Sequence, residues 1–197
     1  NASRWKLIHH GEVYAEQFGA KGNLTANDQP FLQSAINVLS ASRGVLLLRH
    51  TYRVNSSLNY KDNTVIRGIT SEVNADTVMG EAKTDRTFRT QPLICPVDGI
   101  TALRNNTTKP LVGVSFERFG IAPVNRVNDD LPLYHREAVY SPDTVGIDLS
   151  YTTDARILKV MGKGLDALLF TSVSDRVCHR PVIDGIGGYS CNNFINF

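Results

Sequence analysis

The sequence predicts an all-β solenoid, in which short strands wind around an apolar interior behind one α-helix. An amphipathic helical segment is followed by a long series of apolar runs of strand length. Gly146-Ile147-Asp148-Leu149 recurs as Gly164-Leu165-Asp166-Ala167, and Val182-Ile183-Asp184-Gly185 echoes it after the same interval. Repeats of about 20 residues are typical of a stack in which each turn buries its apolar face against the next. A β-sandwich remains the alternative fold.

The helix is expected over residues 28–41. Its apolar residues recur at intervals of three and four and therefore share one face: Phe31, Leu32, Ala35, Ile36 and Leu39. Asn27 is the predicted N-cap, and Asp28 would lie near the positive end of the helix dipole. The apolar face is expected to cap the interior of the stack.

Short strands are predicted after a glycine break at Gly44: Val45–Leu48, Tyr52–Val54, Ser57–Tyr60 and Thr64–Ile69. Alternation returns over residues 111–121. Residues 70–110, with a strand near 93–97, and residues 122–143 are interpreted as polar excursions. Residues 1–17 form a predicted lead-in with a short strand pair. The solenoid domain is predicted over residues 18–197, and we expect it to continue beyond 197, because the last residues alternate as apolar strand positions that a cut stack would leave unpaired.

Residues 18–54 resemble the start of the pectate-lyase-like family of right-handed, single-stranded parallel β-helices, which includes pectin-degrading enzymes and bacteriophage tailspikes. The usual opening reads F-G-A-x-G-D-G-x-T-D-D-T, then a helix, then G-G-x-V-x-x-P-x-G-x-Y. The matching residues are Phe18, Gly19, Ala20, Gly22, Ala35, Ile36, Gly44, Val45, Tyr52 and Val54. The chain departs from the pattern over residues 23–29 and 48–51. The resemblance implies a right-handed parallel β-helix with an N-terminal capping helix, and the motif itself holds no catalytic group.

Composition excludes several classes of function. The formal charge of +2 gives no strong attraction to nucleic acid or to an anionic membrane. No apolar run approaches the roughly 18 residues that suggest a membrane-spanning helix. The sequence also lacks phosphate loops, G-x-S-x-G and zinc-ligand spacings, so we expect no cofactor and no metal. The three cysteines, Cys95, Cys178 and Cys191, are interpreted as free thiols, with a Cys178–Cys191 disulfide as the alternative.

Three carboxylates are the catalytic candidates. Asp148, Asp166 and Asp184 recur at the interval of the sequence repeat, and in a stack with that period they would lie about 4.8 Å apart. Two close carboxylates can divide acid and base roles because their repulsion raises one pKa. A separation of about 5 Å suits a retaining glycosidase, and about 6.5–9.5 Å an inverting one. The simpler interpretation is that each aspartate points outward into solvent.

The second excursion supplies the substrate-binding candidates: Arg126, Asp129, Asp130, Tyr134, His135, Arg136, Glu137 and Tyr140. Arginine can bind an acidic sugar through two hydrogen bonds, and tyrosine offers a sugar ring an apolar face with a polar tip. A solvated loop or a subunit contact is the alternative. A further charged cluster contains Asp175, Arg176, His179 and Arg180, beside Cys178.

The resemblance implies a function in carbohydrate recognition. Among members of the family, the altered cap motif and the irregular insertions are most similar to a phage tailspike. Such a protein is expected to bind and depolymerise a bacterial surface polysaccharide (capsule or lipopolysaccharide), as a glycoside hydrolase or a polysaccharide lyase. The resemblance also implies a homotrimer at the virion tail or outside the cell. The alternatives are a non-catalytic adhesin or structural spike on the same scaffold and, less favoured, a plant-cell-wall pectinase.

Overall fold

Three parallel sheets wind around one apolar interior. The computed structural model describes residues 11–69, 92–127, 140–173, 176–189 and 191–196. Sheet A contains β1 (Glu12–Tyr14), β3 (Val45–Leu48), β6 (Val65–Gly68), β10 (Ser115–Glu117), β14 (Arg156–Leu158) and β19 (Val182–Asp184). Sheet B contains β2 (Asn23–Asn27), β4 (Thr51–Val54), β7 (Leu93–Pro96), β11 (Gly120–Ile121), β15 (Met161–Lys163) and β20 (Gly187–Tyr189).

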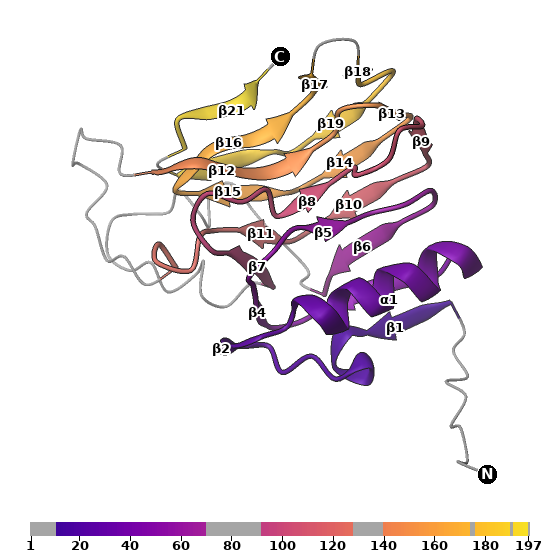
Figure 1. Ribbon diagram of the computed structural model, residues 1–197, viewed down its shortest axis with the longest axis vertical. Coiled ribbons are helices and arrows are strands. Elements are labelled where there is room, and N and C mark those ends of the chain that lie inside the picture. Colours follow the sequence, from indigo (N-terminus) through magenta and orange to yellow (C-terminus); the bar gives the residue numbers. More distant parts are fainter. Residues whose placement is uncertain (1–10, 70–91, 128–139, 174–175, 190, 197) are drawn as a thin grey trace.

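Sheet C completes the turns, and a short strip, here called strip D, follows it in two of them. Sheet C contains β5 (Leu58–Asn59), β8 (Leu103–Arg104), β12 (Ser141–Asp148), β16 (Leu165–Phe170) and β21 (Asn193–Asn196). Strip D pairs β9 (Leu111–Val112) with β13 (Thr152–Thr153). The chain visits A, B, C and D in that order, and Figure 1 shows the turns stacked from α1 to β21. Among the described strands, only the hairpin of β17 (Ser172–Val173) and β18 (Arg176–Val177) pairs antiparallel.

Columns of inward residues hold the turns in register. In sheet A, neighbouring strands align six apolar side chains: Val13, Leu46, Ile66, Phe116, Ile157 and Ile183. The first five are fully or almost fully buried. Burying one such side chain contributes about 1.5–3 kcal/mol, so the interior column is the main force that stacks the turns.

The predicted helix is confirmed as α1 (Gln29–Ser42), which follows the short 3-10 helix η1 (Ala15–Phe18). Helix α1 buries Leu32, Ala35, Ile36 and Leu39 in the main core and contacts η1, β3, β4 and β5. It therefore lies against strands from all three sheets of the first turn (Figure 1). Phe31, which was expected on the same buried face, is 37% exposed.

The start of α1 differs in detail from the prediction. The N-cap position is Asp28, whose side chain makes no capping bond. Its two carboxylate oxygens instead accept hydrogen bonds from the backbone N–H groups of Lys21 (2.7 Å) and Gly22 (3.0 Å). Asn27 Oδ1 accepts from the Gln29 N–H at 3.3 Å. Asp28 is fully buried, so its role is to hold the preceding loop against the helix.

The predicted repeat length is wrong. Ile147 pairs with Leu169, and Leu169 pairs with Ile195, so each turn is longer than the interval from Asp148 to Asp166. The second of these turns is the longer one, because the β17–β18 hairpin is inserted in it between sheet C and strip D. The first excursion is also shorter than predicted, since β7 and β8 belong to sheets B and C. The strand expected near residues 93–97 is confirmed as β7.

Candidate functional site

The three predicted catalytic aspartates do not stack. Asp148 aligns with Phe170 on the neighbouring strand of sheet C, whereas Asp184 lies in sheet A and aligns with Leu158. Asp166 lies near the start of β16, and its Oδ1 accepts a hydrogen bond from Asn192 Nδ2 at 2.9 Å. The aspartates therefore sit at three different places on the stack. A catalytic role for them remains a prediction, without the shared geometry on which it was based.

The predicted substrate-binding excursion is described only at its ends. Asp129, Asp130, Tyr134, His135, Arg136 and Glu137 lie outside the described residues. Arg126 is half-buried, and its Cγ would lie 2.9 Å from a Cβ built on Gly164, so its stem packs closely on that turn. Tyr140 is half-buried directly before β12.

The start of this excursion covers the outer side of sheet B. A small second core there combines Leu93, Cys95 and Met161 from the sheet with Ala122 and Val127 from the excursion. All five are at most 3% exposed. This part of the excursion is therefore structural, and the covered strands present no open surface to a ligand.

The further charged cluster lies beside strip D. The backbone of His179 forms an isolated parallel β-bridge with Thr153, and the side chain of Arg180 forms an exposed 2.8 Å ion pair with Asp154. Cys178 is half-buried, with its Sγ 3.2 Å from Thr152 Oγ1, and burial raises the pKa of its thiol. Asp175 lies outside the described residues. Cys95, Cys178 and Cys191 form no disulfide with one another in the described structure, as the sequence analysis favoured.

The most promising polar surface lies where sheet C turns toward strip D. Asn59, Arg104, Asp148, Phe170 and Asn196 align in register along five neighbouring strands. Each follows a residue whose side chain packs in the core: Leu58, Leu103, Ile147, Leu169 and Ile195. Because side chains alternate along a strand, the aligned residues point outward. We call this column, together with Tyr151 and Arg176, the C–D corner.

Hydrogen bonds between turns fix the backbone of the C–D corner. Asn105 is buried, and its Nδ2 donates to the carbonyl oxygens of Ser150 (3.2 Å) and Tyr151 (3.0 Å) on the next turn. The Tyr60 hydroxyl donates to the carbonyl oxygen of Asp148. Burial raises the pKa of Tyr60 well above its ordinary value, so its hydroxyl remains a donor. Hydrogen bonds from neighbouring turns therefore hold the backbone of the corner in place.

The outward groups of the C–D corner suit binding better than catalysis. Asp148 is half-buried, and its Oδ1 accepts a 2.9 Å hydrogen bond from the Ser150 N–H. Arg104 is exposed and donates a long 3.4 Å hydrogen bond to Asn106. Phe170 is half-exposed between Asp148 and Asn196. Within the described part of this surface, Asp148 is the one carboxylate, so a pair of acids is not present there.

Tyr151 and Arg176 extend this surface toward strip D. The Tyr151 N–H donates to the Arg176 carbonyl oxygen at 3.3 Å, and the Arg176 guanidinium lies 5.8 Å from the centre of the Tyr151 ring. This distance is within the range of a cation–π contact.

The sequence analysis found Asp148 but missed the other members of the aligned column. Their common signal is local, because each of the five column residues directly follows an apolar residue near the end of a short strand. The intervals between them are very unequal, since Leu58 pairs with Leu103 and Ile147 with Leu169. No fixed period could align them.

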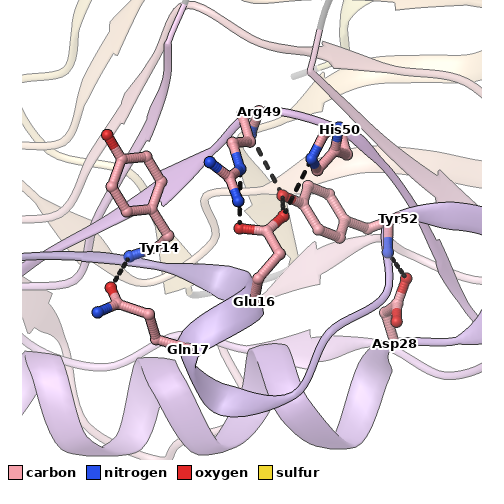
Figure 2. Close-up of polar contacts among 8 residues, drawn as sticks. Tyr14, Glu16, Gln17, Asp28, Arg49, His50 and Tyr52 are labelled. Atoms are coloured by element: carbon pink, nitrogen blue, oxygen red, sulfur yellow. Dashed lines mark hydrogen bonds and ion pairs between the residues drawn. The ribbon is translucent and has the colours of Figure 1, made fainter. Parts of the chain in front are cut away.

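A second polar cluster joins η1 to the first turn (Figure 2). Glu16 accepts a 2.6 Å hydrogen bond from the Tyr52 hydroxyl and contacts Arg49 (3.3 Å) and His50 (3.8 Å). Burial raises the pKa of Tyr52, and Glu16 raises it further, so the hydroxyl cannot serve as a base near neutral pH. Since the Glu16 carboxylate already contacts Tyr52, Arg49 and His50, we assign this cluster a structural role.

Neither a metal centre nor a membrane span is found in the described residues. They contain no group of three or more His, Cys, Asp or Glu side chains placed to hold a metal ion. Within those same ranges, no helix combines the length and apolar character needed to cross a membrane.

Comparisons with known proteins address the fold. The sequence matches no protein-family model and none of the curated proteins. The pre-mature bacteriophage phi29 gene product 12 is similar in structure, with a TM-score of 0.59 and 14% identity; the match covers 94% of this chain and 24% of that one. An iota-carrageenase complexed to iota-carrageenan fragments matches with a TM-score of 0.59 and 18% identity, over 90% of this chain and 36% of that one.

A third similar structure is the A-module of the Azotobacter vinelandii mannuronan C-5 epimerase AlgE4. Its TM-score is 0.55 at 17% identity, and the match covers 89% of this chain and 50% of that one. This chain therefore spans between about a quarter and a half of the three structures. The three sheets, their parallel register and these neighbours show that the chain has a right-handed parallel β-helix fold.

Proposed function

We propose that the chain belongs to a phage tailspike-type protein and binds a bacterial surface polysaccharide along the C–D corner. The observation that carries this proposal is the aligned column of Asn59, Arg104, Asp148, Phe170 and Asn196. It offers a sugar polymer hydrogen-bonding groups and an aromatic face at the strand spacing of about 4.8 Å.

The similar structures support the same class of ligand. One is a phage protein, and two are named for enzymes that act on polysaccharides. In the phage setting, the resemblance of residues 18–54 further implies a capsule or lipopolysaccharide as ligand and a homotrimer at the virion tail. A mass measurement of the native particle would test the trimer, because a monomer or a dimer would contradict it.

Binding is tested with a panel of bacterial capsular polysaccharides and lipopolysaccharides. Wild-type protein is expected to retain at least one polymer, and F170A and R104A are each expected to weaken that binding about tenfold. R118A is the matched control, since Arg118 is exposed in the turn between sheets A and B, away from the C–D corner. Equal binding by all four proteins would remove the C–D corner as the site.

Depolymerisation is the second candidate function, favoured by the half-buried carboxylate of Asp148 within the column. D148N is expected to abolish the release of new reducing ends or of unsaturated products while it retains the polymer. D166N and D184N are matched controls, because both aspartates lie outside the column. If the wild type binds the polymer but releases no product, depolymerisation is ruled out and the protein is a non-catalytic receptor-binding spike.

A further inference from the structure

Tyr151 adopts a backbone conformation that a tyrosine seldom takes. Its φ is +62°, in the left-handed region, where Gly, Asn and Asp are preferred. The left-handed conformation costs a residue with a Cβ roughly 1–2 kcal/mol. Asn63 shows that this chain can place an asparagine in such a position, with a φ of +57°. The tyrosine at residue 151 therefore stands against the backbone preference of its position.

Arg176 lies over the ring of this tyrosine. Its guanidinium is 5.8 Å from the ring centre, and the residue is exposed on β18. A guanidinium held over an aromatic ring can still present the N–H groups on its edge to a ligand. Those N–H groups match the paired oxygens of a carboxylate, sulfate or phosphate.

The charges on the C–D corner also favour an anion. The corner contains two guanidinium groups, Arg104 and Arg176, and one carboxylate, Asp148. Asp148 is partly engaged by the Ser150 N–H, and no ion pair joins it to either arginine within the described residues. The neighbouring carboxylate, Asp154, is already paired with Arg180 at 2.8 Å. Among the described residues, one positive charge at the C–D corner therefore remains unbalanced.

We infer that Tyr151 and Arg176 together bind an anionic substituent on the polysaccharide: Arg176 pairs with the anion, and Tyr151 holds the guanidinium in place beneath it. This inference rests on the proposed function and specifies its ligand as an acidic polysaccharide. The shared chemistry is a carboxylate, sulfate or phosphate carried by a sugar, rather than a free ion.

The test uses matched pairs of polymers that differ only in charge. Binding of the intact chain is measured by affinity electrophoresis in dextran sulfate and in dextran of equal length. An acidic polysaccharide from the bacterial panel is compared with its carboxyl-reduced form. The wild type is expected to bind each charged member at least tenfold more tightly than its neutral partner. R176A is expected to lose that preference, and R176K to keep only part of it because lysine cannot stack as a planar fork.

R118A is the matched control, because Arg118 is exposed, carries the same charge and lies in the turn between sheets A and B. It should keep the wild-type preference. Equal losses in R176A and R118A would show a general effect of charge and overturn the inference. Sodium sulfate that displaces dextran sulfate far better than sodium chloride of equal ionic strength would overturn it too, since the site would then bind the free ion. Equal affinity for the charged and neutral members would also overturn it, while leaving the proposed polysaccharide function intact.

Discussion

The Tyr52 hydroxyl donates a 2.6 Å hydrogen bond to the carboxylate of Glu16, which lies on the other side of α1 in the sequence. This bond joins η1, before the helix, to β4, after it (Figure 2). The same hydroxyl accepts a 3.2 Å bond from the Arg49 N–H. Tyr52 therefore connects the lead-in of the chain to the first complete turn.

We expect Y52F to be less stable than the wild type by about 1–2 kcal/mol, because the Arg49 N–H and the Glu16 carboxylate each lose a partner. Urea denaturation followed by circular dichroism measures the difference. Y14F is the matched control, since Tyr14 is 36% exposed and its hydroxyl takes no part in the bond between Glu16 and Tyr52. Equal stability of Y52F and the wild type would contradict the structural role of this bond.

Stability is expected to fall at alkaline pH. Burial raises the folded-state pKa of Tyr52 and Tyr60 above the ordinary value of about 10. Both groups favour folding below that value, and their contribution declines as pH rises above it, because the unfolded chain then loses protons that the folded chain retains. Unfolding free energies measured between pH 8 and 11 should show this decline. A smaller slope in Y60F than in the wild type would attribute part of the decline to Tyr60.

Glu117 is expected to make the stability of the fold decrease at acid pH. Partial burial alone would raise its pKa, but hydrogen bonds from Ser115 Oγ (2.7 Å) and Arg67 Nε (2.8 Å) outweigh burial and lower it. This stabilisation is present above the ordinary glutamate pKa and disappears as pH falls through the lowered value. E117Q should therefore lose less stability than the wild type between pH 5 and 3. Parallel curves for the two proteins would show that Glu117 does not contribute.

D28N is expected to destabilise the fold by about 1–2 kcal/mol, because one of the two N–H groups that the buried Asp28 carboxylate accepts from is left unpaired. One carboxylate oxygen of Asp28 accepts from Lys21 and the other from Gly22, whereas an asparagine offers only one acceptor oxygen. Thermal unfolding measures the effect. N27D is the control, because Asn27 is exposed and its Oδ1 can be replaced by a carboxylate oxygen. Equal melting temperatures for D28N and N27D would contradict the role assigned to Asp28.

Y151N should separate stability from binding. Asparagine tolerates the left-handed conformation, so the melting temperature is expected to hold or rise, while binding of the acidic polymer weakens. K159N is the matched control: Lys159 has a φ of +54° in the turn between sheets A and B. It should gain stability with unchanged binding. Unchanged binding in Y151N would remove Tyr151 from the site.

The sequence predicted the parts of the fold that depend on local pattern. The apolar face of the helix, the apolar run Val45–Leu48 and the alternation over residues 111–121 led to the correct elements. The repeat length was wrong because Gly-Leu-Asp at residues 164–166 resembles Gly-Ile-Asp at 146–148 in letters but not in register. Val145 aligns with Ala167, so the second motif begins earlier on its strand than the first.

The candidate site was harder to predict because it depends on register between distant residues. Asp148 was identified, but its neighbours in the column, Arg104 and Phe170, come from turns of different length. The bond between Glu16 and Tyr52 likewise spans the whole of α1. When two aligned side chains are separated by an insertion, their distance in the sequence does not reveal that they are neighbours. Only the folded stack brings them together.

The inward column of sheet A keeps its alignment across very unequal lengths of chain. The segment that joins Leu46 to Ile66 is less than half as long as the segment that joins Ile66 to Phe116, yet both pairs align in the same column. The strands keep their register whatever the length of chain between them. The bends are thus natural grafting points: a foreign peptide inserted between Asn106 and Lys109, beside the C–D corner, could change which polymer the protein recognises while the scaffold beneath it stays the same.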